Sequence, residues 1–124
     1  MDQPLPRESA SLDPEGIARL RRLGGDALIA KVLTAFLRDM PARAAAARAA
    51  LRARDSVRLA GALHPMVSTA WNVGAVELAA LAREAEHAAK AEAWPALFDL
   101  VGRTSATVAA VCDALEPLVQ RPAA

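Results

Sequence analysis

Two histidines, His64 and His87, are the residues of this sequence best suited to nucleophilic or acid–base chemistry near neutral pH. His64 lies in the middle of Leu59–Ala75, a segment of mostly small and apolar residues. On a helix of about 100° per residue, His64 is turned by about 140° from an apolar stripe. That stripe consists of Leu59, Ala62, Leu63, Met66, Ala70 and Val73. We therefore expect an imidazole that faces away from the core and can react with a second molecule.

The residues around His64 on the same predicted face are also small or apolar. They lie within about 60° of His64 on a helical wheel and are Val57, Ala60, Gly61, Val67, Ser68 and Trp71. A surface of this kind is unfavourable in water and favourable for docking. We interpret it as the docking surface for a partner protein.

Other kinds of site find little support. The glycine-rich phosphate-binding patterns G-x-x-x-x-G-K-[ST] and G-x-G-x-x-G are missing, so we expect no ATP-binding or autokinase activity. Glu84, Glu86 and His87 lack the spacing of metal ligands, and we interpret them as solvated charges on a helix. No nucleophile-elbow serine is present, and neither histidine has an evident triad partner. The sequence predicts no cofactor and no metal of its own.

The elements that must position His64 are predicted to be helices. The chain has 124 residues, 54% of them apolar with much alanine, no tyrosine and two phenylalanines, which favours one all-α domain. Asp13 and Asp55 are predicted N-caps, and Pro14 and Pro95 occupy early helical positions. Gly24-Gly25 and Gly74 are predicted helix ends, and Asp26 a further cap. We expect bends, without breaks, at Pro41 and Pro65.

Apolar residues recur at helical spacing along each predicted helix. The expected inward positions are Ile29, Val32, Leu33, Phe36, Leu37, Met40, Ala44, Ala47 and Leu51; then Leu78, Leu81, Ala82, Ala85 and Ala89; then Leu97, Val101, Thr104, Val108, Val111, Leu115 and Leu118. Four long amphipathic helices with short turns predict an antiparallel up-down four-helix bundle with a short additional N-terminal helix. We expect residues 12–119 to form this bundle, residues 1–11 to be a disordered lead and residues 120–124 to be a tail.

The net charge and the cysteine content indicate which classes of partner and which compartment to expect. The net charge of +1 gives no drive towards nucleic acid, and no segment has 18 uninterrupted apolar residues, so we expect no membrane partner. The single Cys112 fits a reducing cytoplasm. Six arginines between positions 38 and 58 are either a solvated helix face or a surface for an acidic partner. A monomer is the expected state, because one bundle can bury all four apolar stripes.

The segment around His64 resembles the signature of histidine-containing phosphotransfer (HPt) domains, which is roughly A-H-x-L-K-G-x-x-x-x-L-G-A. His64 matches the phosphorylated histidine, Met66 the apolar position two residues later, and Val73-Gly74-Ala75 the closing L-G-A. The resemblance extends over about 100 residues. It includes Leu12-Asp13-Pro14, the run Phe36–Pro41, the turn at Asp55 and the segment Ala91–Trp94.

Three positions depart from this signature. Val67 replaces the usual lysine, Ser68 the usual glycine, and Pro65 directly follows the histidine. The lysine is thought to help neutralise the phosphoryl group, so Val67 removes a charge-assisted contact worth about 1.5–3 kcal/mol.

The resemblance implies a phosphorelay protein of bacterial two-component signalling. His64 would accept a phosphoryl group from a receiver-domain aspartate and pass it to another receiver domain. The partners would be response-regulator receiver domains or a hybrid sensor histidine kinase, and Mg²⁺ would come with the receiver. Two alternatives stay open. A degenerate relative would dock a receiver or kinase without efficient transfer, and a helical scaffold would make no use of His64.

Overall fold

The computed structural model describes residues 11–120, and these form four helices with no strand among them. The helices are α2 (Pro14–Arg52), α3 (Ser56–Asn72), α4 (Val76–Lys90) and α5 (Trp94–Gln120). The all-α prediction is confirmed. The predicted lead and tail lie outside the described residues, except for Ser11 and Gln120.

Helix starts and turns follow from capping residues in the sequence. The carboxylates of Asp13 and Asp55 accept hydrogen bonds of 3.0 Å from the backbone N–H groups of Glu15 and Arg58, which satisfies donors that a helix start leaves unpaired. Gly25, with φ +70°, is the non-helical residue inside α2, and Gly74, with φ +83°, follows α3. Glycine adopts this left-handed region without steric cost.

The prolines inside the helices do not end them. The α2 helix continues through Pro41, and α3 runs unbroken through Pro65. Gly61, whose carbonyl would have bonded an N–H at position 65, is exposed. An ideal Cβ built on Gly61 would meet no atom within 4 Å.

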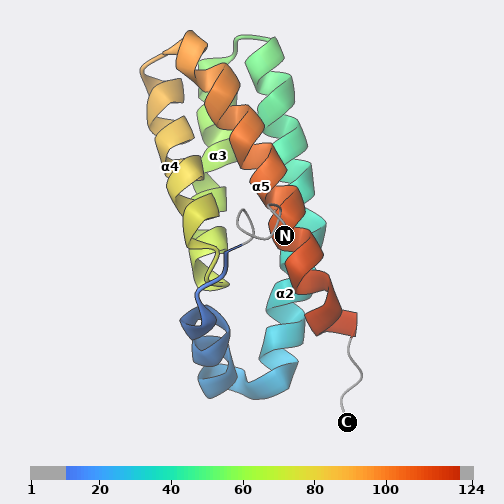
Figure 1. The fold of residues 1–124 in the computed structure, drawn as a ribbon. Coiled ribbons are helices and arrows are strands. Elements are labelled where there is room, and N and C mark those ends of the chain that lie inside the picture. Colours follow the sequence, from blue (N-terminus) through green and yellow to red (C-terminus); the bar gives the residue numbers. More distant parts are fainter. Residues whose placement is uncertain (1–10, 121–124) are drawn as a thin grey trace, which may run out of the picture.

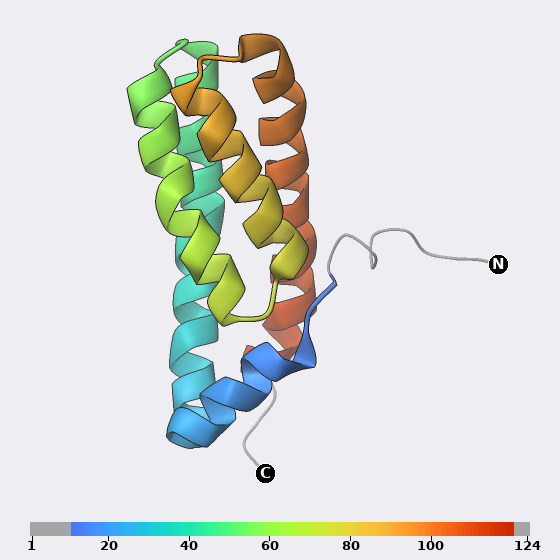
Figure 2. The same cartoon turned by 90° about the vertical axis from the view of Figure 1, so that its left-hand side faces the viewer.

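The helices pack so that neighbours in sequence are neighbours in space. The packed pairs are α2 with α3, α3 with α4, α4 with α5, and α5 with α2. The chain reverses at each connection, and residues 14–24 lie across one end of the bundle, at the bottom of both views (Figures 1 and 2). The interior is lined by most of the positions that the helical spacing predicts, including Leu33, Met40, Leu63 and Leu115.

Leu118 is a wrong core prediction, because 39% of its surface is exposed. The last turn of α5 extends past the α3–α4 turn, so α4 cannot cover it (Figure 1). Cys112 is only half buried. Burial, followed by the charges of Asp113 and Glu116, raises the pKa of this thiol to about 11.

A close backbone contact fixes the turn between α3 and α4. The N–H of Asp13 donates a 2.7 Å hydrogen bond to the carbonyl of Gly74. A Cβ on Gly16 would lie 2.5 Å from the backbone nitrogen of Gly74, and a Cβ on Gly74 would collide with the carbonyl of Asp13. The contact therefore requires glycine at both positions. This turn joins the two helices that carry His64 and Glu86, and it therefore helps to set their register.

Most of the arginines between positions 38 and 58 make contacts within the protein. Arg38 and Arg43 pair with Asp39, and Arg58 pairs with Asp55. Arg48 donates a hydrogen bond to Ser105. The guanidinium of Arg54 lies 5.6 Å and 4.7 Å from the ring centroids of Trp94 and Phe98. These contacts favour the interpretation as a solvated, structural face over a surface for an acidic partner.

Candidate functional site

The imidazole of His64 projects from the middle of α3 with 77% of its side chain exposed. Its Nδ1 atom lies 2.8 Å from Oε2 of Glu86 on α4. The side chain of Glu86 is only 9% exposed. The pair therefore joins a solvent-facing ring to a carboxylate held between two packed helices.

The charge of Glu86 determines which ring nitrogen of His64 carries the proton. Burial alone would raise the pKa of Glu86, but hydrogen bonds from His64 and Lys90 outweigh it, and the pKa is lowered from its ordinary value. Glu86 is thus ionised at neutral pH, and an ionised carboxylate can only accept hydrogen bonds. Nδ1 of His64 must be the donor, which leaves the lone pair of a neutral ring on Nε2.

Lys90 completes the group. Its Nζ atom lies 3.2 Å from the same Oε2 of Glu86, one helical turn further along α4. The lysine side chain is 65% exposed. A nearly buried carboxylate thus has two cationic or polar partners at its surface, which offsets the cost of burying its charge.

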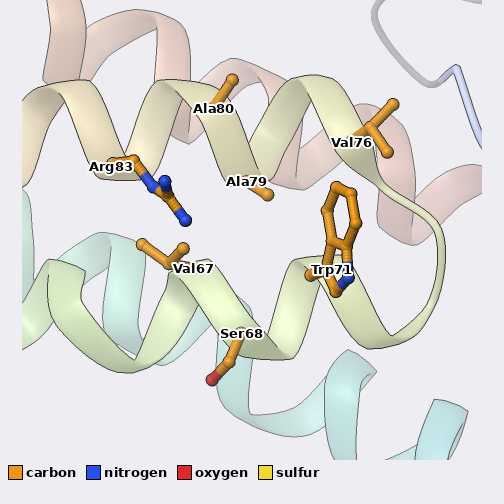
Figure 3. A pocket seen from close by; sticks show the side chains of 7 residues that line it. All are labelled: Val67, Ser68, Trp71, Val76, Ala79, Ala80 and Arg83. Atoms are coloured by element: carbon orange, nitrogen blue, oxygen red, sulfur yellow. The ribbon is translucent and has the colours of Figure 1, made fainter.

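An apolar groove of about 460 Å³ lies beside His64 between α3 and α4. Figure 3 shows Val67 and Trp71 on α3 facing Ala79 and Arg83 on α4, while Ser68 points away from α4. Val76 and Ala80 complete the lining. The pair Val67 and Arg83 has the same antiparallel register as the pair His64 and Glu86. Val67 lies three residues after His64, and Arg83 lies three residues before Glu86.

The structure places the predicted docking residues around His64 with unequal exposure. Val57 and Trp71 are strongly exposed, at 82% and 57%. Gly61 and Ser68 are exposed, while Ala60 and Val67 are half buried against the core. Val67, Ser68 and Trp71 share the groove, whereas Val57, Ala60 and Gly61 lie outside its lining. Their role in docking stays a prediction.

The interpretation of Glu86 as a solvated charge is wrong. No triad partner of His64 was evident in the sequence, and the structure places the carboxylate of Glu86 against its Nδ1. Glu86 is buried and bonded to His64, whereas Glu84 and His87 are exposed as expected. The signal was present in the spacing: Glu86 follows Leu78 and Ala82 at steps of four, on the inward side of α4. A glutamate at such a position needs a polar partner.

Two further searches cover the described residues only. Between residues 11 and 120, no helix is long and apolar enough to cross a membrane. In the same part of the chain, no three His, Cys, Asp or Glu side chains are grouped so that they could hold a metal ion.

A family model described as the Hpt domain matches residues 31–121. The chain belongs to the Hpt domain family. Comparisons with curated proteins and with solved structures find no match. The Hpt match spans α3 and α4 in full, and with them His64, Glu86 and Lys90.

Hpt domains are histidine phosphotransfer modules of phosphorelay signalling, and they work without kinase or ATP-binding activity of their own. They interact with the receiver domains and kinases of two-component systems. In this Hpt domain the one exposed histidine with a buried carboxylate partner, among the described residues, is His64.

Proposed function

We propose that this Hpt domain accepts a phosphoryl group on Nε2 of His64 from a receiver-domain aspartate and passes it to a second receiver domain. The observation that carries the proposal is the 2.8 Å contact between Nδ1 of His64 and the ionised Glu86. This contact holds the proton on Nδ1, so the exposed ring has its free lone pair on Nε2, facing away from the carboxylate.

The transfer step asks little covalent chemistry of the protein. The lone pair of Nε2 forms the N–P bond, and the P–O bond to the receiver aspartate breaks with its electron pair going to that carboxylate. The proton on Nδ1 stays in its hydrogen bond to Glu86, so no general base is needed. The positive charge that the ring gains lies beside the negative charge of Glu86, which favours the phosphorylated state. The receiver brings the Mg²⁺ that such transfers use.

The surface around His64 fits the docking of a receiver domain. The groove with Val67, Ser68 and Trp71 lies on one side of the ring, and Val57, Ala60 and Gly61 belong to the same helix on the other. The proposal assigns all six residues to docking. We also propose that the four helices form an antiparallel up-down bundle, and that residues 14–24 are the short additional helix that contacts the α3–α4 turn.

Transfer of radioactive phosphate from a phosphorylated receiver domain tests the proposal. Wild-type protein should acquire an acid-labile, hydroxylamine-sensitive label, and His64→Ala should acquire none. His87→Ala is the matched control, because His87 is the second histidine and is exposed on α4; it should label like wild type. Equal labelling of wild type and His64→Ala, or no labelling with any receiver of a cognate panel, would refute the relay.

The structure also leaves a second candidate function, because Val67 stands where the family signature has lysine. A degenerate Hpt domain would bind a receiver or kinase without transferring phosphate. Trp71 reports on binding, since 57% of its surface is exposed in the groove. In a Trp94→Phe background, a fluorescence change on adding receiver without any labelling would select this second function, and no binding at all would favour a scaffold.

A further inference from the structure

We propose that Lys90 contacts the phosphoryl group of His64 and supplies, from α4, the positive charge that Val67 leaves missing on α3. This inference rests on the proposed phosphotransfer at His64. The starting observation is that α3 has no cation near the ring. Its one lysine or arginine is Arg58, two turns before His64 and paired with Asp55.

Distance favours Lys90. Its Nζ atom lies 3.2 Å from Oε2 of Glu86, and Nδ1 of His64 lies 2.8 Å from that same oxygen. The ammonium is therefore at most about 6 Å from the imidazole, as two contacts to one atom require. An ammonium has three N–H donors, and its contact with Glu86 uses one. The remaining donors, on a side chain that is 65% exposed, are available to phosphoryl oxygens.

The direction of the side chains separates Lys90 from Arg83, the other cation on this face of α4. Helical side chains lean towards the N-terminus of their helix. Lys90 lies one turn after Glu86, so its stem leans towards Glu86 and the ring of His64. Arg83 lies one turn before Glu86 and leans away from the ring, and Figure 3 shows its guanidinium beside Val67, at the groove. Arg83 lines the groove that the proposed function assigns to docking, so it is no neutral control. The matched control is Lys31, the other lysine of the sequence, which is exposed on α2.

The charges around the site change during transfer in a way that frees Lys90. In the form that attacks, the ring of His64 has a free lone pair on Nε2, and the ionised Glu86 faces this ring and the ammonium. Once Nε2 forms the N–P bond and the receiver carboxylate leaves with the electrons of the P–O bond, the ring carries the positive charge. Glu86 is then neutralised by the ring, and the charge of Lys90 faces the oxygens of the phosphoryl group, where negative charge is spread in the transition state.

The test measures single-turnover transfer from a phosphorylated receiver domain to the full chain carrying Lys90→Gln, Lys90→Arg or Lys31→Gln. We expect Lys90→Gln to lower the rate at saturating receiver by about tenfold or more, which is the loss of one charge-assisted contact. Receiver affinity should change by less than about threefold, because the contact forms with the moving phosphoryl group. Lys90→Arg should restore most of the rate, and Lys31→Gln, which removes the same charge far from the ring, should transfer like wild type.

A second measurement separates contact with phosphate from positioning of the ring. Nitrogen-15 NMR of the unphosphorylated variants reports which ring nitrogen of His64 carries the proton, and Lys90→Gln should keep it on Nδ1. A wild-type rate in Lys90→Gln, an equal loss in Lys31→Gln, or a shift of the proton to Nε2 would each overturn the inference while leaving the proposed function intact. Absence of label in the wild-type protein would overturn both.

Discussion

Nδ1 of His64 and Oε2 of Glu86 lie 2.8 Å apart across the interface of α3 and α4, although 22 positions separate the two residues in the sequence. One partner is 77% exposed and the other 9%. The contact links the reactive surface of this Hpt domain to its packed interior. Because Glu86 is ionised, it accepts a hydrogen bond from Nδ1 of His64, and Nε2 of a neutral ring then has its lone pair free.

Replacing Glu86 by glutamine should slow phosphotransfer to His64. The amide keeps the shape of the side chain but loses the charge that stabilises the ring after the N–P bond forms. A charge-assisted hydrogen bond is worth about 1.5–3 kcal/mol, so we expect single-turnover transfer to fall by about tenfold or more. Nitrogen-15 NMR should show a mixture of ring tautomers, because an amide can donate as well as accept.

Glu84→Gln is the control for this prediction. It removes the same charge from an exposed position on the same helix, so it should leave both the rate and the tautomer unchanged. If both variants transfer like wild type, the Glu86 contact has no part in the reaction.

The sequence predicts the ends and the buried faces of the helices that carry this site well, because both depend on local interactions. Asp55 accepts the predicted N-cap hydrogen bond and Gly74 has the predicted positive φ. Leu63, Met66 and Ala70 are fully buried, as their spacing requires. These features depend on neighbours within one or two turns, and a single sequence contains that information.

The partners of His64 could not be predicted in the same way, since they come from another helix. The register between α3 and α4 decides that Glu86, and not Glu84, meets the imidazole. We expect that register to depend on the packing of α3 against α4 and on the Gly74 turn, whose contact with Asp13 joins parts of the chain about 60 residues apart. Tertiary packing of this kind decides polar contacts that helical periodicity leaves open.

Val67→Lys should compensate for the loss of Lys90. Position 67 faces the groove one turn after His64, and a lysine there leans back towards the ring along α3. In the wild-type background we expect a modest gain in phosphohistidine lifetime or transfer yield, because Lys90 already supplies a charge. In the Lys90→Gln background the same substitution should recover most of the lost rate.

A double-mutant cycle measures this coupling from four single-turnover rates. Equal gains from Val67→Lys in both backgrounds would show that the two positions act independently. The result would then argue against a shared role in neutralising the phosphoryl group.

Acid should destabilise the fold partly through Glu86. Its pKa is lower in the folded protein than in the unfolded chain, so the unfolded chain binds more protons as the pH falls. The stabilisation is complete above the pKa of an unperturbed glutamate, about 4.3, and is lost as the pH drops through the lower folded value. Denaturant unfolding between pH 7 and pH 2.5 should therefore show a steeper loss of stability in wild type than in Glu86→Gln.

Asp39 also has a lowered pKa, chiefly from its hydrogen bond with Arg38, but it is present in both proteins. The difference between the two curves therefore reports Glu86 together with its contacts to His64 and Lys90. Parallel curves across this range would mean that the ion pairs of Glu86 add nothing to folding stability.

The contact between Gly74 and Asp13 should make Gly74→Ala strongly destabilising. An alanine there is strained by the positive φ of +83°, and its Cβ would collide with the carbonyl oxygen of Asp13. The left-handed conformation alone costs roughly 1–2 kcal/mol, and the collision with rigid backbone adds to it. Gly102→Ala is the control, since a Cβ there meets nothing within 4 Å in the middle of α5; it should stabilise by about 0.5–1 kcal/mol. Urea unfolding measures both changes.

Because the turn sets the register of α3 against α4, Gly74→Ala should also weaken the contact of His64 with Glu86, seen as a shifted ring tautomer by NMR. A Gly74→Ala protein as stable as wild type, with its proton still on Nδ1, would show that the α3–α4 register does not depend on this turn.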